Sequence, residues 1–181
     1  MNPEPNNLFL IGYRCTGKSS VGRSLSEKLG WPFIDTDSLL VIRQKMSIKE
    51  IVGAYGWEGF REMEHTILKK VCTSDEQVVA TGGGVVLNEN NVMRMQKSGR
   101  VIWLKATPET IKARMLQDKD TRDFRPSLTL DGSISEIEET LHSREPFYKS
   151  ATDQFVDTDD LTIRAITGII IERLRVIEPK K

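Results

Sequence analysis

Short apolar runs alternate along the chain with longer segments in which apolar residues recur every three or four positions. The first run, residues 8–11, is continuous and uncharged, as in a strand that is buried on both faces of a parallel sheet. Similar runs follow at residues 32–34, 77–80, 101–104 and 154–156. Five short strands that alternate with helical segments predict an α/β fold, a three-layer sandwich around a five-stranded parallel sheet.

Capping residues mark where several of the predicted helices begin and end. Gly30 follows the first helical stripe at the position of a left-handed C-cap. Ser47 and Ser133 each precede a glutamate by three residues, the spacing of a capping box, and Pro108 suits the first position of another helix. Residues 118–131 interrupt the periodicity with a polar stretch, which we interpret as a mobile lid.

The composition is that of an ordinary globular chain, and it narrows the possible functions. A length of 181 residues fits one domain over residues 1–181. The 26 basic and 26 acidic residues leave no excess positive charge for a nucleic-acid backbone, and no apolar run is long enough to span a membrane. Cys15 and Cys72 are too few for a disulfide framework and too far apart for a metal-binding pair. We therefore expect a cytoplasmic monomer without a nucleic-acid or membrane partner.

The clearest motif is a glycine-containing loop between the first predicted strand and the first predicted helix. Residues 12–19 read GYRCTGKS and match G-x-x-x-x-G-K-[ST], in the context that a phosphate-binding P-loop requires. Backbone N–H groups of such a loop and the N-terminus of the following helix bind phosphate oxygens. The expected nucleotide ligands are Cys15, Thr16, Gly17, Lys18, Ser19 and Ser20. The motif predicts the fold of P-loop NTPases, of the nucleoside-monophosphate-kinase-like type, with ATP and Mg²⁺ as cofactors.

A pair of aspartates follows the second predicted strand, whereas no acid follows the third. Asp35 and Asp37 are two residues apart, so in an extended segment they would project to the same side and flank one reacting hydroxyl. Either residue could instead cap the helix that follows, a common role for aspartate. We favour the functional interpretation of both and keep the capping role as the alternative.

Two further segments point to a second ligand-binding site, although a P-loop by itself does not show which reaction the protein catalyses. Arg61 and Glu64 are three residues apart in a helical stretch, so we expect an orienting ion pair. Residues 82–84 are three glycines at the end of the third strand, where bare backbone N–H groups can approach a ligand closely. Trp57 either lines this site or packs the domain, with equal support for the two roles.

Together these motifs resemble the shikimate kinase family, and they occur in the family's order over roughly residues 8–174. The matching segments are the P-loop, Asp35-x-Asp37, Phe60-Arg61-x-x-Glu64, Thr81-Gly82-Gly83-Gly84, Arg125-Pro126 and Arg144-Glu145-Pro146-x-Tyr148. The chain departs from the family at residues 156–161, where members often have an arginine and a proline that sandwich adenine. The residues that contact adenine are therefore left open.

The resemblance implies how the acceptor is bound and oriented. Asp37 contacts the ring hydroxyls, Arg61 and Arg144 hold the carboxylate, and the loop around Gly83 donates backbone hydrogen bonds. Asp37 also orients the reacting hydroxyl, and the sequence leaves open whether it accepts the proton as well. The acceptor-binding region then spans about residues 35–64.

The resemblance also implies which residues act on the nucleotide. Ser19 and Asp35 hold Mg²⁺, Asp35 through water. Lys18 and Arg125 bind the phosphates and stabilise the charge on the transferred group, Arg125 from the predicted lid. The catalytic residues are thus expected to be Lys18, Asp37 and Arg125.

The implied reaction is the ATP-dependent phosphorylation of the 3-hydroxyl of shikimate, a step on the route to chorismate and the aromatic amino acids. One alternative is a P-loop kinase for another small hydroxylated acceptor, such as gluconate or a nucleoside monophosphate. Another is a nucleotide-gated binding module without turnover. Two arginines and paired acids favour a hydroxylated carboxylate. The intact Lys18, Ser19, Asp37 and Arg125 argue against a loss of turnover.

Overall fold

A five-stranded parallel sheet forms the centre of the computed structural model, which describes residues 6–117, 134–152 and 154–177. The strands lie in the order β2-β3-β1-β4-β5. Their bounds are β1 (Asn7–Ile11), β2 (Phe33–Asp35), β3 (Val78–Ala80), β4 (Gly99–Lys105) and β5 (Phe155–Asp157). The predicted α/β fold is confirmed, and the carboxyl ends of all the strands share one edge of the sheet.

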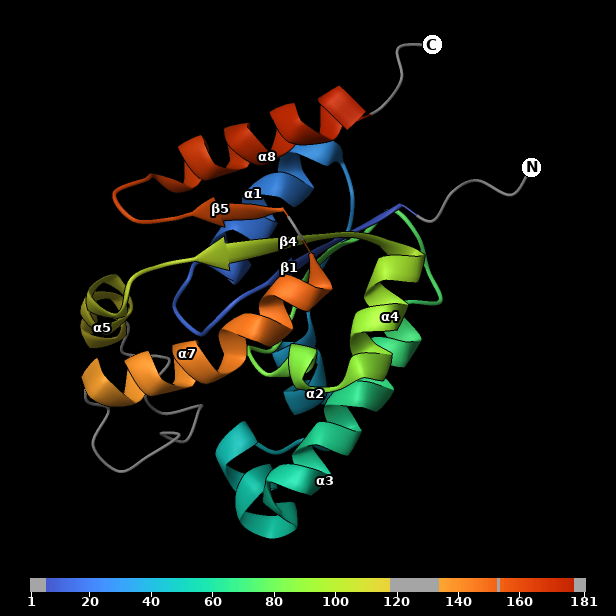
Figure 1. Cartoon of the computed structure of the whole chain (residues 1–181). Coiled ribbons are helices and arrows are strands. Elements are labelled where there is room, and N and C mark those ends of the chain that lie inside the picture. The colour runs from blue at the N-terminus through green and yellow to red at the C-terminus, as the bar shows by residue number, and fades with distance from the viewer. Residues whose placement is uncertain (1–5, 118–133, 153, 178–181) are drawn as a thin grey trace.

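Helices cover both faces of the sheet and make it the middle layer of three (Figure 1). One face carries α1 (Lys18–Leu29) and α8 (Ile163–Ile177). The other side holds α2 (Thr36–Gln44), α3 (Ile48–Val71), the 3₁₀ turn η1 (Val85–Leu87), α4 (Glu89–Ser98) and α7 (Ile134–Ala151). Helix α5 (Pro108–Gln117) packs against α7. None of the described helices combines the length and the apolar character that crossing a membrane requires.

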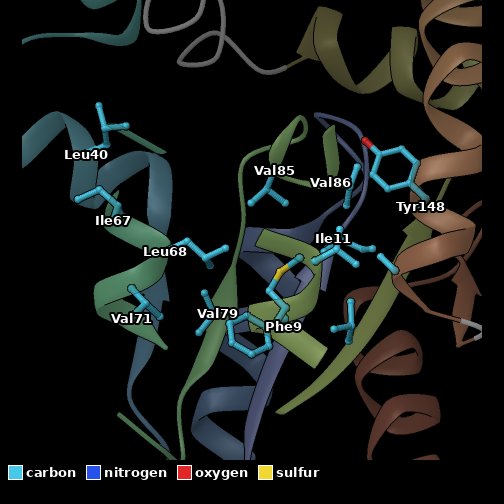
Figure 2. Packing of buried hydrophobic residues seen from close by; sticks show 14 of the residues in the cluster. Phe9, Ile11, Leu40, Ile67, Leu68, Val71, Val79, Val85, Val86 and Tyr148 are labelled. Carbon is cyan, nitrogen blue, oxygen red and sulfur yellow. The ribbon is translucent and has the colours of Figure 1, made fainter. Parts of the chain in front are cut away.

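Alternate side chains of β1 serve the two faces of the sheet. Phe9 and Ile11 belong to the apolar cluster under α3, α4 and α7, and Leu8 and Leu10 belong to the cluster under α1 and α8. Figure 2 shows Phe9 beside Val79 of the neighbouring strand in the first cluster. Burying each of these side chains contributes about 1.5–3 kcal/mol. This two-sided packing fixes the end of β1, from which the P-loop starts.

The capping signals of the sequence correspond to observed helix ends. Gly30 ends α1 in the left-handed conformation, with φ 71°. Ser47 begins α3 with a complete capping box, in which its hydroxyl accepts a hydrogen bond from the Glu50 N–H. Pro108 is the first residue of α5. Ser133 and the lid predicted over residues 118–131 lie outside the described residues.

One local feature differs from the prediction, and a second was not predicted. Asp37 was expected in an extended segment, but β2 ends at Asp35 and Asp37 lies in the first turn of α2. The extended interpretation was wrong because Asp35 Oδ1 accepts a hydrogen bond of 3.0 Å from the Ser38 N–H and so caps a helix that already begins at Thr36. In addition, α3 is kinked at Gly56, whose φ of 68° and ψ of 177° suit only a glycine.

Candidate active site

The P-loop connects β1 to α1 at the carboxyl edge of the sheet. Lys18 is the first residue of α1 and is buried. Its Nζ donates hydrogen bonds to the carbonyl oxygens of Gly12, at 2.8 Å, and Tyr13, at 2.7 Å. The ammonium is therefore held against the loop, at the helix N-terminus where anions are stabilised.

The other predicted nucleotide ligands form the rest of the loop and the first turn of α1. Thr16 Oγ1 donates a hydrogen bond of 2.8 Å to the Tyr13 carbonyl and closes the loop on itself. Cys15 and Gly17 adopt left-handed backbone conformations, with φ of 61° and 93°. Left-handed residues in such loops help to make anion-binding concavities of N–H groups. Ser20 is exposed on α1.

The two predicted Mg²⁺ residues contact each other. Ser19 Oγ donates a hydrogen bond of 2.6 Å to Asp35 Oδ2. The second oxygen of Asp35 caps α2, so this carboxylate has the capping role and also faces the P-loop. A hydroxyl and a carboxylate are oxygen donors of the kind that Mg²⁺ takes while keeping several waters. The residues at this position therefore fit the expected ion.

The four predicted acceptor residues line one pocket beside the P-loop. Asp37 comes from α2, Arg61 from α3, Gly83 from the loop after β3, and Arg144 from α7. The full lining is Tyr13, Arg14, Asp37, Ile48, Trp57, Phe60, Arg61, Glu64, Gly82, Gly83, Gly84 and Arg144. This pocket combines two carboxylates, three guanidinium groups and three aromatic rings, which suits a small polar ring with a negative charge.

Arg61 is positioned by contacts within its own helix. Its Nη1 donates a hydrogen bond of 2.7 Å to Glu64 Oε2, as the spacing predicted. The guanidinium also lies 5.1 Å from the centroid of the Phe60 ring and 5.7 Å from that of Trp57. These cation–π contacts orient the planar group toward the pocket. Trp57 thus lines the pocket and is 39% exposed, which resolves the choice that the sequence left open.

The three glycines allow charged side chains to approach the loop after β3. A Cβ atom on Gly82 would overlap Glu64 Oε1 and Asp37 Oδ1, and one on Gly84 would overlap the Arg61 guanidinium. The Gly82 N–H is already bonded to Thr36 Oγ1, at 3.1 Å. At Gly82 and Gly84, the missing side chains therefore make room for the walls of the pocket.

Helix α7 fixes the same glycine loop from the opposite side. Arg144 Nη1 donates a hydrogen bond of 3.4 Å to the Gly83 carbonyl, and the Tyr148 hydroxyl donates one of 2.6 Å to the same oxygen. Burial raises the pKa of Tyr148 well above its usual value, so its hydroxyl remains a donor at every physiological pH. Figure 2 shows Tyr148 close to Val86, just after the glycines.

Glu64 is the most buried carboxylate of the pocket, with 2% exposure. Burial raises its pKa to about 6; Arg61 opposes this shift, while the negative charge of Asp37 adds to it. Its Oε1 atom has no hydrogen-bond partner among the described residues. This carboxyl group therefore titrates much closer to neutral pH than an ordinary glutamate.

Sequence reasoning overlooked several residues of the site. Arg14 lines the acceptor pocket, but the P-loop motif accepts any residue at its position. Arg114 of α5 donates hydrogen bonds to the Cys15 carbonyl, at 3.3 Å, and to the Thr158 carbonyl, at 2.7 Å, linking the P-loop to the segment after β5. Its position on a basic helix face was the available signal. Arg125 lies outside the described residues.

Comparison of the sequence with protein families gives one result over most of the chain. A family model described as shikimate kinase matches residues 14–175. The chain is 39% identical to a shikimate kinase of Caldanaerobacter subterraneus over 91% of its length and 94% of that protein. It is also 39% identical to a shikimate kinase of Moorella thermoacetica, over 94% of this chain and 95% of the relative.

Comparison with solved structures gives the same result for the fold. The shikimate kinase of Acinetobacter baumannii in complex with shikimate superposes with a TM-score of 0.89, at 27% identity, over 97% of this chain and 96% of that one. The shikimate kinase of Aquifex aeolicus gives 0.79 at 30% identity, with coverages of 93% and 96%. A gluconokinase of Sinorhizobium meliloti gives 0.57 at 16% identity, with coverages of 97% and 99%, which shows the shared fold alone.

Proposed function

Because the chain belongs to the shikimate kinase family, we propose that it transfers the terminal phosphoryl group of ATP to the 3-hydroxyl of shikimate. The products are ADP and shikimate 3-phosphate. The observation that carries this proposal is the pocket beside the P-loop, which brings Asp37, Arg61 and Arg144 together from three different helices. A carboxylated ring with hydroxyl groups matches these side chains in charge and in hydrogen-bonding capacity.

Acceptor recognition uses the two arginines as a clamp on one carboxylate. Arg61 keeps its orientation through Glu64 and Phe60, and Arg144 through the Gly83 carbonyl. Guanidinium groups present planar pairs of donors that match a carboxylate. With the carboxylate held at one end, the ring hydroxyls face the buried Asp37 side chain.

Nucleotide binding uses the P-loop and its neighbours. Lys18 exchanges its two carbonyl partners for phosphate oxygens when ATP binds. Ser19 and Asp35 would hold Mg²⁺, and the ion would neutralise part of the phosphate charge. The hydroxyl and the carboxylate that are joined in this structure support this part of the proposal.

Catalysis then consists mainly of alignment and charge stabilisation. Phosphoryl transfer passes through a loose transition state, so no covalent intermediate with the protein is needed. Asp37 orients the acceptor hydroxyl in line with the phosphoryl group and accepts its proton as the new P–O bond forms. Lys18 stabilises the negative charge on the phosphoryl oxygens. The sequence assigns the same task to Arg125.

A coupled assay of ADP release tests the proposal. Shikimate should support turnover, whereas gluconate, quinate and nucleoside monophosphates at the same concentration should support at least about a hundredfold less. Lys18→Met should abolish the shikimate-dependent rate. Phosphorus NMR of the product should place the phosphate on the 3-hydroxyl. Turnover that is equal for gluconate and shikimate would favour the alternative kinase, and ATP binding without ADP release would favour the binding module.

We further propose that residues 1–181 act as a single kinase domain, as a monomer in the cytoplasm. What supports the monomer is that side chains of one chain supply the whole lining of the acceptor pocket among the described residues. Light scattering at assay concentrations checks this: a mass near 20.5 kDa is expected, and a mass of twice that value contradicts it.

A further inference from the structure

Two carboxylates lie unusually close together in the acceptor pocket. Glu64 Oε1 and Asp37 Oδ1 both occupy the space in front of Gly82, where a single Cβ atom would overlap them. The two oxygens are therefore no more than about 5 Å apart, a distance at which one carboxylate disfavours the ionisation of another. Neither residue is more than 8% exposed, so water screens this repulsion poorly.

The two carboxylate oxygens of Glu64 differ in their hydrogen bonding within the described residues. Oε2 accepts the hydrogen bond from Arg61, whereas Oε1 has no donor among the described residues. An ionised carboxylate with a buried, unpaired oxygen is costly, and a proton on Oε1 removes that cost. The raised pKa of Glu64 agrees with this geometry.

The charged and titratable groups around Glu64 come from every wall of the pocket. They are Arg61 on the same helix, Asp37 on α2, Tyr13 and Arg14 from the P-loop, and Arg144 and Tyr148 on α7. Arg61 and Arg144 both favour the ionised form of Glu64. An acceptor carboxylate bound to the same two guanidinium groups adds negative charge beside Glu64 and excludes water. Both effects favour protonation.

We propose that the acceptor binds together with a proton, which is held on Glu64 Oε1. This inference rests on the proposed function, because it requires an anionic acceptor between Arg61 and Arg144. Glu64 then acts as a positioning residue whose charge is adjusted on binding. Its neutral form leaves Arg61 free to neutralise the acceptor, and it removes a negative charge from beside Asp37, the carboxyl group that faces the hydroxyl.

Calorimetric titration of shikimate, without nucleotide, measures this proton directly. At pH 7, titrations in two non-phosphate buffers of different ionisation enthalpy should show uptake of about half a proton or more per shikimate bound. The Kd of the wild-type protein should rise with pH above 6, by up to about tenfold per pH unit, until Glu64 ionises in the complex as well. In Glu64→Gln the proton uptake should disappear and the Kd should be nearly independent of pH.

Glu62→Gln is the matched control, because it makes the same chemical change at an exposed position on the same helix. It should retain the proton uptake of the wild type. Binding of shikimate by the wild type without proton exchange, or uptake that persists in Glu64→Gln, would overturn the inference while the proposed function stands. No binding of shikimate at all would instead contradict the proposed function. The wild-type titration alone decides the question if Glu64→Gln does not fold.

Discussion

Ser19 Oγ donates a hydrogen bond of 2.6 Å to Asp35 Oδ2, and this contact links the start of α1 to the end of β2. The same carboxylate caps α2 through the Ser38 N–H. One side chain thus caps α2 and also faces the P-loop. A substitution that tests the proposed role of Asp35 in Mg²⁺ binding must therefore leave its role as the cap of α2 intact.

Asp35→Asn should remove the proposed contribution of Asp35 to Mg²⁺ binding while keeping its role as the cap of α2. Asparagine is as good an N-cap as aspartate, because its single oxygen can accept the hydrogen bond from the Ser38 N–H. Its NH₂ group would then donate to the Ser19 hydroxyl where the second carboxylate oxygen now accepts, and the side chain lacks the negative charge that attracts Mg²⁺. The Mg²⁺ concentration for half-maximal rate should rise by at least about tenfold, as expected when a charge-assisted contact is lost. The melting temperature and the shikimate Kd should change little. An unchanged Mg²⁺ requirement would show that Asp35 serves only as a cap.

Arg144→Ala should raise the shikimate Kd by about 10- to 150-fold, because a charge-assisted hydrogen bond contributes about 1.5–3 kcal/mol. Arg144→Lys should recover only part of the loss, since an ammonium cannot present two parallel donors. Titrations with shikimate and with an ATP analogue distinguish the sites, and Lys149→Ala, whose side chain is 66% exposed on the same helix, is the control. Equal weakening for both ligands would mean that Arg144 supports the glycine loop and not the acceptor.

Arg61→Ala should weaken shikimate binding to a similar extent, but it should also destabilise the protein. Removing Arg61 leaves Glu64 buried without its cation, whereas Arg144 forms no ion pair with a carboxylate of the described residues. Thermal unfolding at pH 7.5 should therefore show a lower melting temperature for Arg61→Ala than for Arg144→Ala. The difference in melting temperature between the two variants should become smaller below pH 6, where Glu64 is protonated. A difference in melting temperature that does not change with pH would contradict this explanation.

Much of this architecture could be predicted because it depends on local patterns. The run at residues 8–11 became β1, and the capping box at Ser47 became the start of α3, since each signal involves only neighbouring residues. Asp37 was misplaced because a single hydrogen bond from Ser38 to Asp35 decides where the strand gives way to the helix. Local periodicity does not resolve a boundary of two residues.

Contacts between distant segments were the part that sequence patterns could not supply. The bond from Tyr148 to the Gly83 carbonyl joins residues 65 positions apart, and the bond from Arg114 to the Cys15 carbonyl joins residues 99 positions apart. Such contacts depend on how α5 and α7 pack over the sheet, which no local motif encodes. The motifs named the acceptor residues one by one, but only the fold shows that Glu64 and Asp37 share the space in front of Gly82.

Gly82→Ala should impair the acceptor pocket more than the fold. The added methyl group would overlap Glu64 Oε1 and Asp37 Oδ1, so both carboxylates must move away from their present positions. Overpacking of this kind costs about 1–3 kcal/mol, and we expect the shikimate Kd to rise by at least about tenfold. Gly53→Ala is the matched control, because a Cβ there meets nothing within 4 Å and alanine favours the helix. Unchanged shikimate binding in Gly82→Ala would show that the carboxylates are not fixed.

Glu64→Gln should change how stability depends on pH. In the folded protein Glu64 keeps its proton up to a pH of about 6, while in the unfolded chain it loses the proton near its ordinary value of 4.5. Between these values the folded state binds more protons than the unfolded state, so the contribution of Glu64 to the free energy of unfolding falls as pH rises, by about 2 kcal/mol in total.

Glutamine has no proton to lose. The free energy of unfolding of Glu64→Gln relative to wild type should therefore increase by most of that amount between pH 4.5 and 7, as measured by urea denaturation. All other titrating groups are common to both proteins and cancel in this difference. A difference that is constant with pH, or that falls as pH rises, would mean that Arg61 stabilises the ionised carboxylate at least as much as burial and Asp37 destabilise it.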